Sequence, residues 1–275
     1  MISIYLTEWD FPGARSLAAR RLDRFPEFIR SRYTRFLRPE RAYSFLIGQA
    51  VLLYGLYDLK IPFDGGAFVR DEYGRPSIRE CGNPSIGKYG KPSNGEHGGP
   101  SIGGEVDFNI SHSGQMVACA IGKGSRVGID IEKVDERRHL LNFEGYFFEE
   151  EWERIMSSED VYGAFYEYWT KKEAALKADG RGLSVSLKRV RVSGERVSID
   201  GECFCCRPFD VAAGYRGHIA SARPFAEAVV VPVDFSRLMD ELSRPSGDVG
   251  GPAGELSRLS DDISRPLKIY NDPGR

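Results

Sequence analysis

The sequence predicts an α+β fold built from two similar α/β halves. Short runs of β-branched residues alternate along the chain with segments of helical periodicity. The first half shows helices and then a strand, whereas the second shows strands, then helices, then strands again. A Gly- and Pro-rich repeat lies near the junction. We expect an N-terminal half over residues 1–105, a C-terminal half over residues 106–233 and a disordered tail over residues 234–275.

The first half begins with a predicted strand over residues 2–6. A basic helix is expected over residues 26–36, and a stronger helix over residues 39–59, where apolar side chains recur at spacings of three or four. Pro39 suits the first turn of this second helix. A further strand is predicted over residues 67–70.

Residues 74–105 divide into four octapeptides, GRPSIREC, GNPSIGKY, GKPSNGEH and GGPSIGGE. A period of eight is too short for a helical solenoid repeat, and the Gly and Pro content favours a mobile loop. Removing three copies leaves a single turn between two strands. We therefore interpret the repeats as a local duplication within that turn.

The second half has a regular pattern. Strands are predicted over residues 106–110, 116–121 and 127–132, and helices over residues 149–156 and 161–179. The second helix is expected to end at Gly180 or Gly182. Alternation in RVRVSGERVSID and EAVVVPV predicts several short strands between residues 187 and 233.

Composition excludes several classes of protein. The net charge of −2 provides no basic field for nucleic acid or for an anionic membrane. No apolar run approaches the roughly 20 residues of a membrane helix, and the N-terminus lacks the pattern of a signal peptide. The five cysteines fit no disulfide or zinc spacing. We expect a cytoplasmic protein with free thiols.

The first motif with chemical meaning is VGIDIE over residues 127–132. Alternate side chains of a strand share a face, so Asp130 and Glu132 point together while the apolar residues face a core. Two carboxylates this close repel each other unless a cation lies between them, and magnesium prefers such hard oxygen ligands. For the pair taken alone, a solvated strand face is the simpler interpretation.

The second motif is the helical segment WTKKEAALK over residues 169–177. Trp169, Glu173 and Lys177 are spaced by four and therefore lie on one helix face. A surface ion pair explains the last two residues equally well. The tryptophan on the same face indicates partial burial.

The third motif is FNISHSG over residues 108–114, which reads as a strand leading into a turn. His112, flanked by two hydroxyl groups, suits contact with a phosphate. A histidine bonded to its own turn is the alternative. The FNISHSG segment is not a G-x-S-x-G hydrolase signature. The sequence has no phosphate-binding P-loop, which argues against a nucleotide hydrolase or another magnesium-dependent phosphotransferase.

In this order and combination, the three motifs resemble those of the 4'-phosphopantetheinyl transferase superfamily. The length is similar to that of its larger, Sfp-like branch, in which two similar halves form a pseudodimer within one chain. The resemblance covers roughly residues 1–233 and is strongest over residues 108–183. It implies the fold of that family and a monomer.

The resemblance implies a set of site residues. Asp130 and Glu132 resemble the strand carboxylates that bind magnesium, and Glu173 resembles the helix glutamate that completes the metal site. Lys177 resembles the lysine that meets the phosphates of coenzyme A. Glu151, in an F-x-x-x-E segment, resembles a further acidic position near the metal or acting as a base.

The resemblance also implies contacts to coenzyme A. Ser111 and His112 resemble the pair that contacts its phosphates, with His112 at the 3'-phosphate. The basic helix around Arg32 occupies the region of further 3'-phosphate contacts, although its arginines match no relative one by one. For a Y-G-K-P-like turn that holds the adenine, Arg75 follows a predicted strand, whereas Lys91 matches letter for letter within the repeats. We favour Arg75.

The implied reaction is of the holo-[acyl-carrier-protein] synthase type. It moves the phosphopantetheine of coenzyme A to a serine of an acyl or peptidyl carrier protein, with magnesium as cofactor and adenosine 3',5'-bisphosphate as product. Glu173, Glu151 or a water is expected to take the serine proton, and Lys177 to assist the departing phosphate. The alternative is a catalytically degenerate binder of coenzyme A or carrier protein, against which the intact D-x-E and E-x-x-x-K elements argue.

Overall fold

A computed structural model describes residues 1–25, 27–61, 68–70, 73, 75–79 and 105–238. Residues 80–104, which include the second and third octapeptides and all of the fourth but Glu105, lie outside these residues, and so do Lys91 and most of the C-terminal tail. The predictions for these segments, including a mobile loop and a disordered tail, therefore stay predictions.

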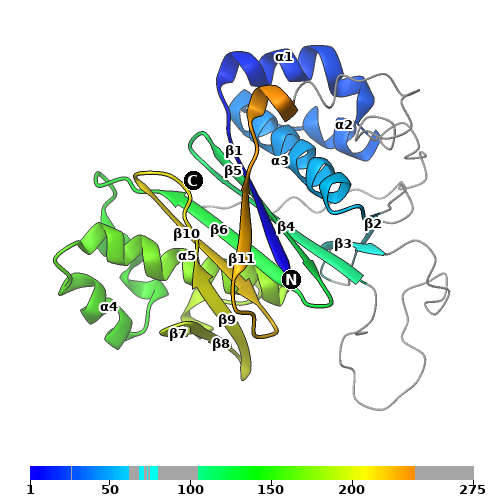
Figure 1. Cartoon of the computed structure of the whole chain (residues 1–275). Helices are drawn as coiled ribbons and strands as arrows, with labels where there is room; N and C mark the ends of the chain where they lie inside the picture. Colours follow the sequence, from blue (N-terminus) through cyan, green and yellow to red (C-terminus); the bar gives the residue numbers. More distant parts are fainter. Residues whose placement is uncertain (26, 62–67, 71–72, 74, 80–104, 239–275) are drawn as a thin grey trace.

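Two sheets form the centre of the described structure (Figure 1). The first has the strand order β11-β1-β5-β4-β3-β2, and only the β11–β1 pair in it is parallel. Its strands are β1 (Ile2–Glu8), β2 (Phe68–Arg70), β3 (Pro76–Arg79), β4 (Glu105–Ser113), β5 (Met116–Lys123) and β11 (Ala228–Pro232).

The second sheet is antiparallel, with the order β6-β10-β9-β8-β7. Its strands are β6 (Val127–Lys133), β7 (Val190–Ser193), β8 (Arg196–Ile199), β9 (Glu202–Pro208) and β10 (Tyr215–Ser221). Strand β6, which carries the VGIDIE motif, is thus an edge strand of its own sheet.

The helices lie on the outer faces of the sheets (Figure 1). The first sheet is covered by α1 (Phe11–Arg21), α2 (Glu27–Tyr33) and α3 (Pro39–Asp58), and the second by α5 (Val161–Asp179), with α4 (Glu149–Met156) beside it. Short 3₁₀ helices are η1 (Leu22–Arg24), η2 (Leu140–Tyr146), η3 (Gly182–Ser184) and η4 (Leu187–Arg189).

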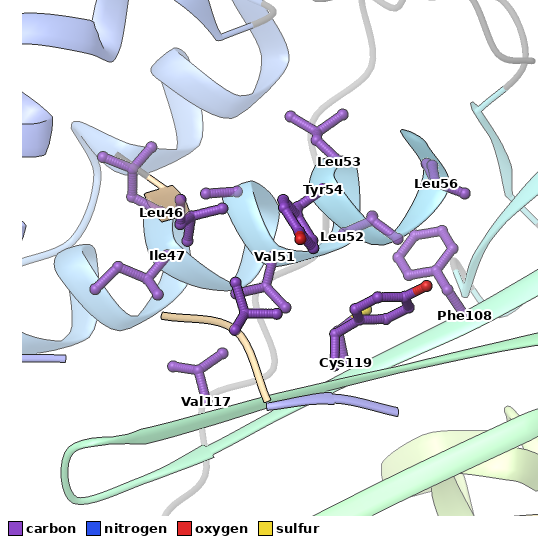
Figure 2. Close-up of a cluster of buried hydrophobic side chains, with 14 of the residues drawn as sticks. Leu46, Ile47, Val51, Leu52, Leu53, Tyr54, Leu56, Phe108, Val117 and Cys119 are labelled. Atoms are coloured by element: carbon purple, nitrogen blue, oxygen red, sulfur yellow. The ribbon is translucent and has the colours of Figure 1, made fainter. Parts of the chain in front are cut away.

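Alternation along β1 explains the layers. Ile2, Ile4 and Leu6 pack between the sheets with residues such as Ile129 of β6, whereas Tyr5 points to the opposite side, into the core beneath α3. Figure 2 shows this second core, where apolar side chains of α3 meet Val117 and Cys119 of β5 and Phe108 of β4. The order of layers is therefore helix, sheet, sheet, helix.

Each sheet carries one long helix, α3 or α5, which confirms the α+β class predicted from the sequence. The chain moves between the sheets more than once, since β4 and β5 belong to the first sheet and β11 returns to it. The division into halves at residue 105 stays a prediction.

Local chemistry accounts for the helix ends. The side chain of Asp10 accepts a hydrogen bond from Gly13 N at 2.6 Å and so caps α1, a helix that the sequence analysis did not predict. Gly180 ends α5 with φ of 90°, in the left-handed region that glycine adopts without strain. None of the helices in the described part of the chain combines the length and the apolar character needed to cross a membrane.

Strand β4 differs from the prediction. The predicted strand ended at residue 110, with a turn close behind it, but the strand continues through Ser113 and the turn follows at Gly114, whose φ is 55°. Strand β3 was also not predicted. Strand β4 is longer because its backbone pairs with β5 as far as Ser113, which lies opposite Met116.

Candidate active site

The VGIDIE strand has one apolar and one charged face, as predicted. Val127, Ile129 and Ile131 are at most 1% exposed and pack between the two sheets. Asp130 and Glu132 lie on the other face and are also buried, with 4% and 3% of their surface exposed. The solvated strand face considered for this pair is therefore wrong.

Gly128 lies on the same face as the two carboxylates and brings β6 close to α5. A β-carbon at this position would lie 2.1 Å from the carbonyl oxygen of Ala174 and 2.3 Å from the backbone nitrogen of Ala178. Both are backbone atoms that no rotamer change moves. Only glycine allows the strand and the helix to approach this closely.

Lys177 of α5 points at Asp130. Its Nζ lies 2.7 Å from Asp130 Oδ1, 3.1 Å from Ser111 Oγ and 3.1 Å from the carbonyl oxygen of Ile129. The lysine side chain keeps 29% exposure while the aspartate side chain keeps 6%. Because Asp130 also accepts a hydrogen bond from Ser111 Oγ at 3.0 Å, its Oδ1 has two donors.

The second oxygen of Asp130 has no hydrogen-bond partner among the described residues, although it is buried. A buried carboxylate oxygen without a donor costs free energy, so a missing cationic or donor group is expected there. This is the observation that fits a bound cation at the site.

Glu132 lies two residues after Asp130 on the same face of β6 and accepts a hydrogen bond from Ser113 Oγ at 2.8 Å. A cavity of about 360 Å³ opens beside it. Its lining contains two acidic and three basic side chains. The lining residues are Ser113, Glu132, Lys133, Val134, Asp135, Arg137 and Arg138.

Glu173 lies one turn before Lys177 on α5 and is half-buried. Trp169, a further turn back, packs against Phe143 and Phe165 at ring-centroid distances of 5.5 and 5.8 Å, which confirms the partial burial expected of it. Within the described residues, no three His, Cys, Asp or Glu side chains gather closely enough to hold a metal by themselves.

Arg75 lies in the seam where β4, β6 and α5 meet. Its side chain is 8% exposed and pairs with the buried carboxylate of Asp107. It also donates to the carbonyl oxygens of Lys177 and Val127, the latter at 2.5 Å. Burial raises the pKa of Asp107, and Arg75 and the Val127 N–H oppose that shift. These contacts give Arg75 a structural role, and its assignment to the adenine stays a prediction.

Glu151 lies in a buried network away from the solvent, at 2% exposure. One oxygen accepts from Lys172 Nζ at 2.7 Å and from Phe148 N at 3.0 Å, and the other accepts from Val192 N at 2.7 Å. Burial lowers the pKa of Lys172, and Glu151 opposes the shift. The F-x-x-x-E segment located Glu151, but nothing in the sequence indicated its lysine partner.

The expected coenzyme A contacts do not all point the same way. Ser111 is buried and bonded within the protein, whereas His112 is exposed and lies on the opposite face of β4. Arg32 of α2 stacks on the ring of Phe45, 4.9 Å from its centroid, and burial lowers its pKa. The structure therefore brings Lys177, Ser111 and Asp130 together and leaves Arg32 and His112 on other surfaces.

Known proteins are similar to this chain in the region that carries the motifs. A model of the 4'-phosphopantetheinyl transferase superfamily matches residues 126–222, from β6 to β10. The 4'-phosphopantetheinyl transferase gsp of Aneurinibacillus migulanus is 29% identical over 158 residues, which cover 56% of this chain and 56% of that relative. A putative 4'-phosphopantetheinyl transferase of Haemophilus influenzae is 39% identical over 98 residues, 34% of this chain and 41% of that protein.

A longer similarity covers both sheets. The 4'-phosphopantetheinyl transferase Sfp of Bacillus subtilis is 27% identical over 242 residues, which cover 82% of this chain and 96% of Sfp. This chain is thus similar to the 4'-phosphopantetheinyl transferase superfamily over residues 126–222 and to Sfp-like members of that superfamily over most of its length.

Proposed function

We propose that this protein transfers the 4'-phosphopantetheine group of coenzyme A to a serine of an acyl or peptidyl carrier protein and releases adenosine 3',5'-bisphosphate. This is the reaction of holo-[acyl-carrier-protein] synthase, carried out by an enzyme of the Sfp-like branch. The observation that carries the proposal is the buried Asp130, with Lys177 at one oxygen and no partner among the described residues at the other. A monomer acting in the cytoplasm is part of the proposal.

Magnesium is the proposed cofactor, held by Asp130, Glu132 and Glu173. Since the described side chains do not gather closely enough to hold an ion by themselves, substrate phosphates or water would complete its ligands. The donor set supports this choice, because carboxylates on a strand and a facing helix are the hard oxygen ligands that Mg²⁺ binds together with substrate phosphates. When bound, the ion would neutralise negative charge on the pyrophosphate of coenzyme A.

The protein's own groups account for the remaining steps. Glu173 takes the proton of the carrier serine, whose oxygen attacks the phosphorus that bears pantetheine. The bond from that phosphorus to the bridging oxygen breaks, and the positive charge of Lys177 stabilises the departing adenosine 3',5'-bisphosphate. Glu151 is the less favoured base, since both its oxygens already accept hydrogen bonds in a buried network.

Binding of coenzyme A is proposed to use Lys177 at the pyrophosphate and Arg32 and His112 at the 3'-phosphate. His112 is exposed to solvent, which suits this role. For the adenine, Arg75 and Lys91 remain the two candidates. The guanidinium of Arg75 is already engaged by contacts within the protein. These contacts favour binding of the adenine by the backbone of the Arg75 segment over binding by the guanidinium.

Docking of the carrier is proposed at the basic side of the cavity beside Glu132. Arg137 is 90% exposed there, and Arg138 stacks on Phe143 at 5.2 Å. An acidic carrier surface would complement these arginines. Charge reversal at Arg137 is expected to raise KM for the carrier and to leave the affinity for coenzyme A unchanged.

The test is the intact mass of a panel of apo carrier proteins after incubation with this protein, coenzyme A and magnesium, with EDTA as the control. A gain of one phosphopantetheine that is lost with EDTA supports the proposal and identifies the preferred carrier. Measurable coenzyme A binding without any gain in mass on a carrier contradicts it and favours the catalytically degenerate binder.

A further inference from the structure

Four alternate side chains of β4 bind the backbone of β6 across the junction between the two sheets. They are acceptors for the N–H groups of every second residue of β6. The bonds are Val127 N to Asp107 at 2.6 Å, Ile129 N to Asn109 at 3.1 Å, Ile131 N to Ser111 at 3.2 Å, and Lys133 N to Ser113 at 3.0 Å. We call this set the β4 ladder.

The ladder satisfies an edge that would otherwise be open. Strand β6 is the edge strand of the second sheet, and its outward N–H groups would lack partners in the buried seam. On the same edge, the carbonyl oxygens of Val127 and Ile129 accept from Arg75 and Lys177. Polar side chains therefore complete the edge of β6 in place of a further strand.

Two members of the ladder do more than bind the backbone. Ser111 Oγ accepts from Ile131 N and donates to Asp130 Oδ1 at 3.0 Å. Ser113 Oγ accepts from Lys133 N and donates to Glu132 Oε2 at 2.8 Å. In both cases one hydroxyl group joins a carboxylate to the N–H of the next residue, so the same geometry occurs twice.

This arrangement fixes both carboxylates. A hydroxyl has a single proton, and when that proton points at a carboxylate anchored on the neighbouring strand, it restricts the rotamers of the acidic side chain. For Asp130 the bonded oxygen is Oδ1, which leaves Oδ2 buried and without a partner among the described residues. The serine and Lys177 thus hold the side chain with one oxygen available.

We propose that Ser111 and Ser113 are positioning residues that hold Asp130 and Glu132 in the orientation needed to bind the metal, an inference that rests on the function proposed above. Their role is to orient acidic ligands, in contrast to the direct phosphate contact expected of Ser111 from the sequence. Groups that hydrogen-bond to metal ligands typically change metal affinity by about 10- to 100-fold when they are removed.

Ser113 gives the cleaner test, because it is half-buried and, unlike Ser111, it makes no contact with Lys177. The probe is Mn²⁺, titrated by electron paramagnetic resonance into the protein with coenzyme A and without a carrier. We expect Ser113→Ala to weaken Mn²⁺ binding by about 10-fold or more, and Ser113→Thr to restore it, because threonine keeps the hydroxyl.

Asn109→Ala is the matched control. Asn109 Oδ1 accepts from Ile129 N in the same ladder, and this hydrogen bond involves no carboxylate. Loss of the β4 ladder hydrogen bond made by Asn109 or by Ser113 is expected to lower the midpoint of thermal unfolding by about 2 to 4 °C. Only the serine variant is expected to change the Mn²⁺ affinity.

The outcomes separate this inference from the function on which it rests. Equal Mn²⁺ affinity in Ser113→Ala and the unaltered protein, with binding lost in Asp130→Ala, overturns the positioning role and leaves the proposed function standing. An equal loss of Mn²⁺ affinity in Ser113→Ala and Asn109→Ala also overturns the positioning role, because the effect then follows from the loss of any hydrogen bond of the β4 ladder. If the unaltered protein binds no Mn²⁺ and transfers no phosphopantetheine, both proposals are wrong.

Discussion

The backbone of Gly128 in β6 passes so close to Ala174 in α5 that an added β-carbon would lie 2.1 Å from the Ala174 carbonyl oxygen. The substitution Gly128→Ala therefore has to move the helix and the strand apart. Since Lys177 reaches Asp130 across this contact, the same movement separates the two charged groups.

We expect Gly128→Ala to lower the free energy of unfolding by about 3 kcal/mol, as overpacking against backbone does, and to reduce phosphopantetheine transfer. Urea unfolding measures the first effect. Gly145→Ala is the control, because its new β-carbon would meet only Lys188 side-chain atoms at 3.8 Å. Equal stability of the two variants would contradict the close approach of strand and helix.

Replacing Asp130 by asparagine removes the charge and keeps the shape. We expect transfer to fall by more than about 100-fold, since loss of a direct metal ligand should exceed the effect of losing a group that merely orients one. The fold should persist, as judged by circular dichroism. Asp210→Asn, at an exposed loop position, is the control. Retained transfer at saturating magnesium would refute the metal assignment.

Glu151 and Lys172 form a buried ion pair with side-chain exposures of 3% and 0%. Removing one partner leaves an uncompensated buried charge, so Lys172→Met and Glu151→Gln should each cost about 3 to 5 kcal/mol of stability. The double variant should lose less than the sum of the two, which a double-mutant cycle in urea measures. If the double variant folds and transfers no phosphopantetheine, Glu151 acts in the chemistry after all.

His218 is 2% exposed, and its Nδ1 lies 2.7 Å from the Thr170 hydroxyl. Burial lowers its pKa from 6.5 to about 3. Because the unfolded chain binds this proton at a higher pH than the folded protein, stability should fall as the pH decreases from about 6.5 to about 3, by up to about 5 kcal/mol for this group alone.

Carboxylates titrate in the same pH range as His218. Comparing the unfolding free energies of histidine variants with those of the unaltered protein separates the contribution of His218 from theirs. His218→Gln should show a shallower loss of unfolding free energy over these pH values, whereas His139→Gln, at an exposed position, should follow the unaltered protein. Parallel curves for all three proteins would show that His218 does not stay neutral in the folded state.

Residues 80–104, which hold most of the octapeptide repeats, join two strands whose ends are already paired. Arg79 of β3 and Glu105 of β4 are antiparallel partners, so a two-residue turn is long enough to connect them. We expect a variant in which Asn-Gly replaces residues 80–104 to fold and to keep transfer activity. A variant in which one Gly-Gly-Glu linker replaces residues 82–105 should also fold and keep transfer activity. Loss of coenzyme A binding, measured by calorimetry, would show that the repeats themselves contact the nucleotide.

Elements with local determinants were predictable from the sequence. The bounds of α4 and α5 agree residue for residue with the prediction, because an acidic first turn marks the start of α4 and a glycine marks the end of α5. Helix α1 has a similar mark in Asp10 and Pro12, which the sequence analysis overlooked. The alternation in VGIDIE likewise gave the correct two faces of β6.

Features that depend on a distant partner were not predictable. The polar alternation of Asp107, Asn109, Ser111 and Ser113 is visible in the sequence, but its acceptors serve a strand in another sheet, 20 residues further along the chain. The lysine partner of Glu151 and the need for glycine at 128 likewise arise only when tertiary packing brings the segments together.

The parallel pairing of β1 with β11 has a consequence for synthesis on the ribosome. Strand β1 emerges before the other described strands, yet one of its two edges is covered only when residues 228–232 are made, after which Val233 N donates to Leu6 O at 2.7 Å. Until then the nascent chain carries an apolar strand with an open edge, which is a template for pairing with other chains. Premature termination before residue 228 should therefore yield aggregated rather than partly active protein.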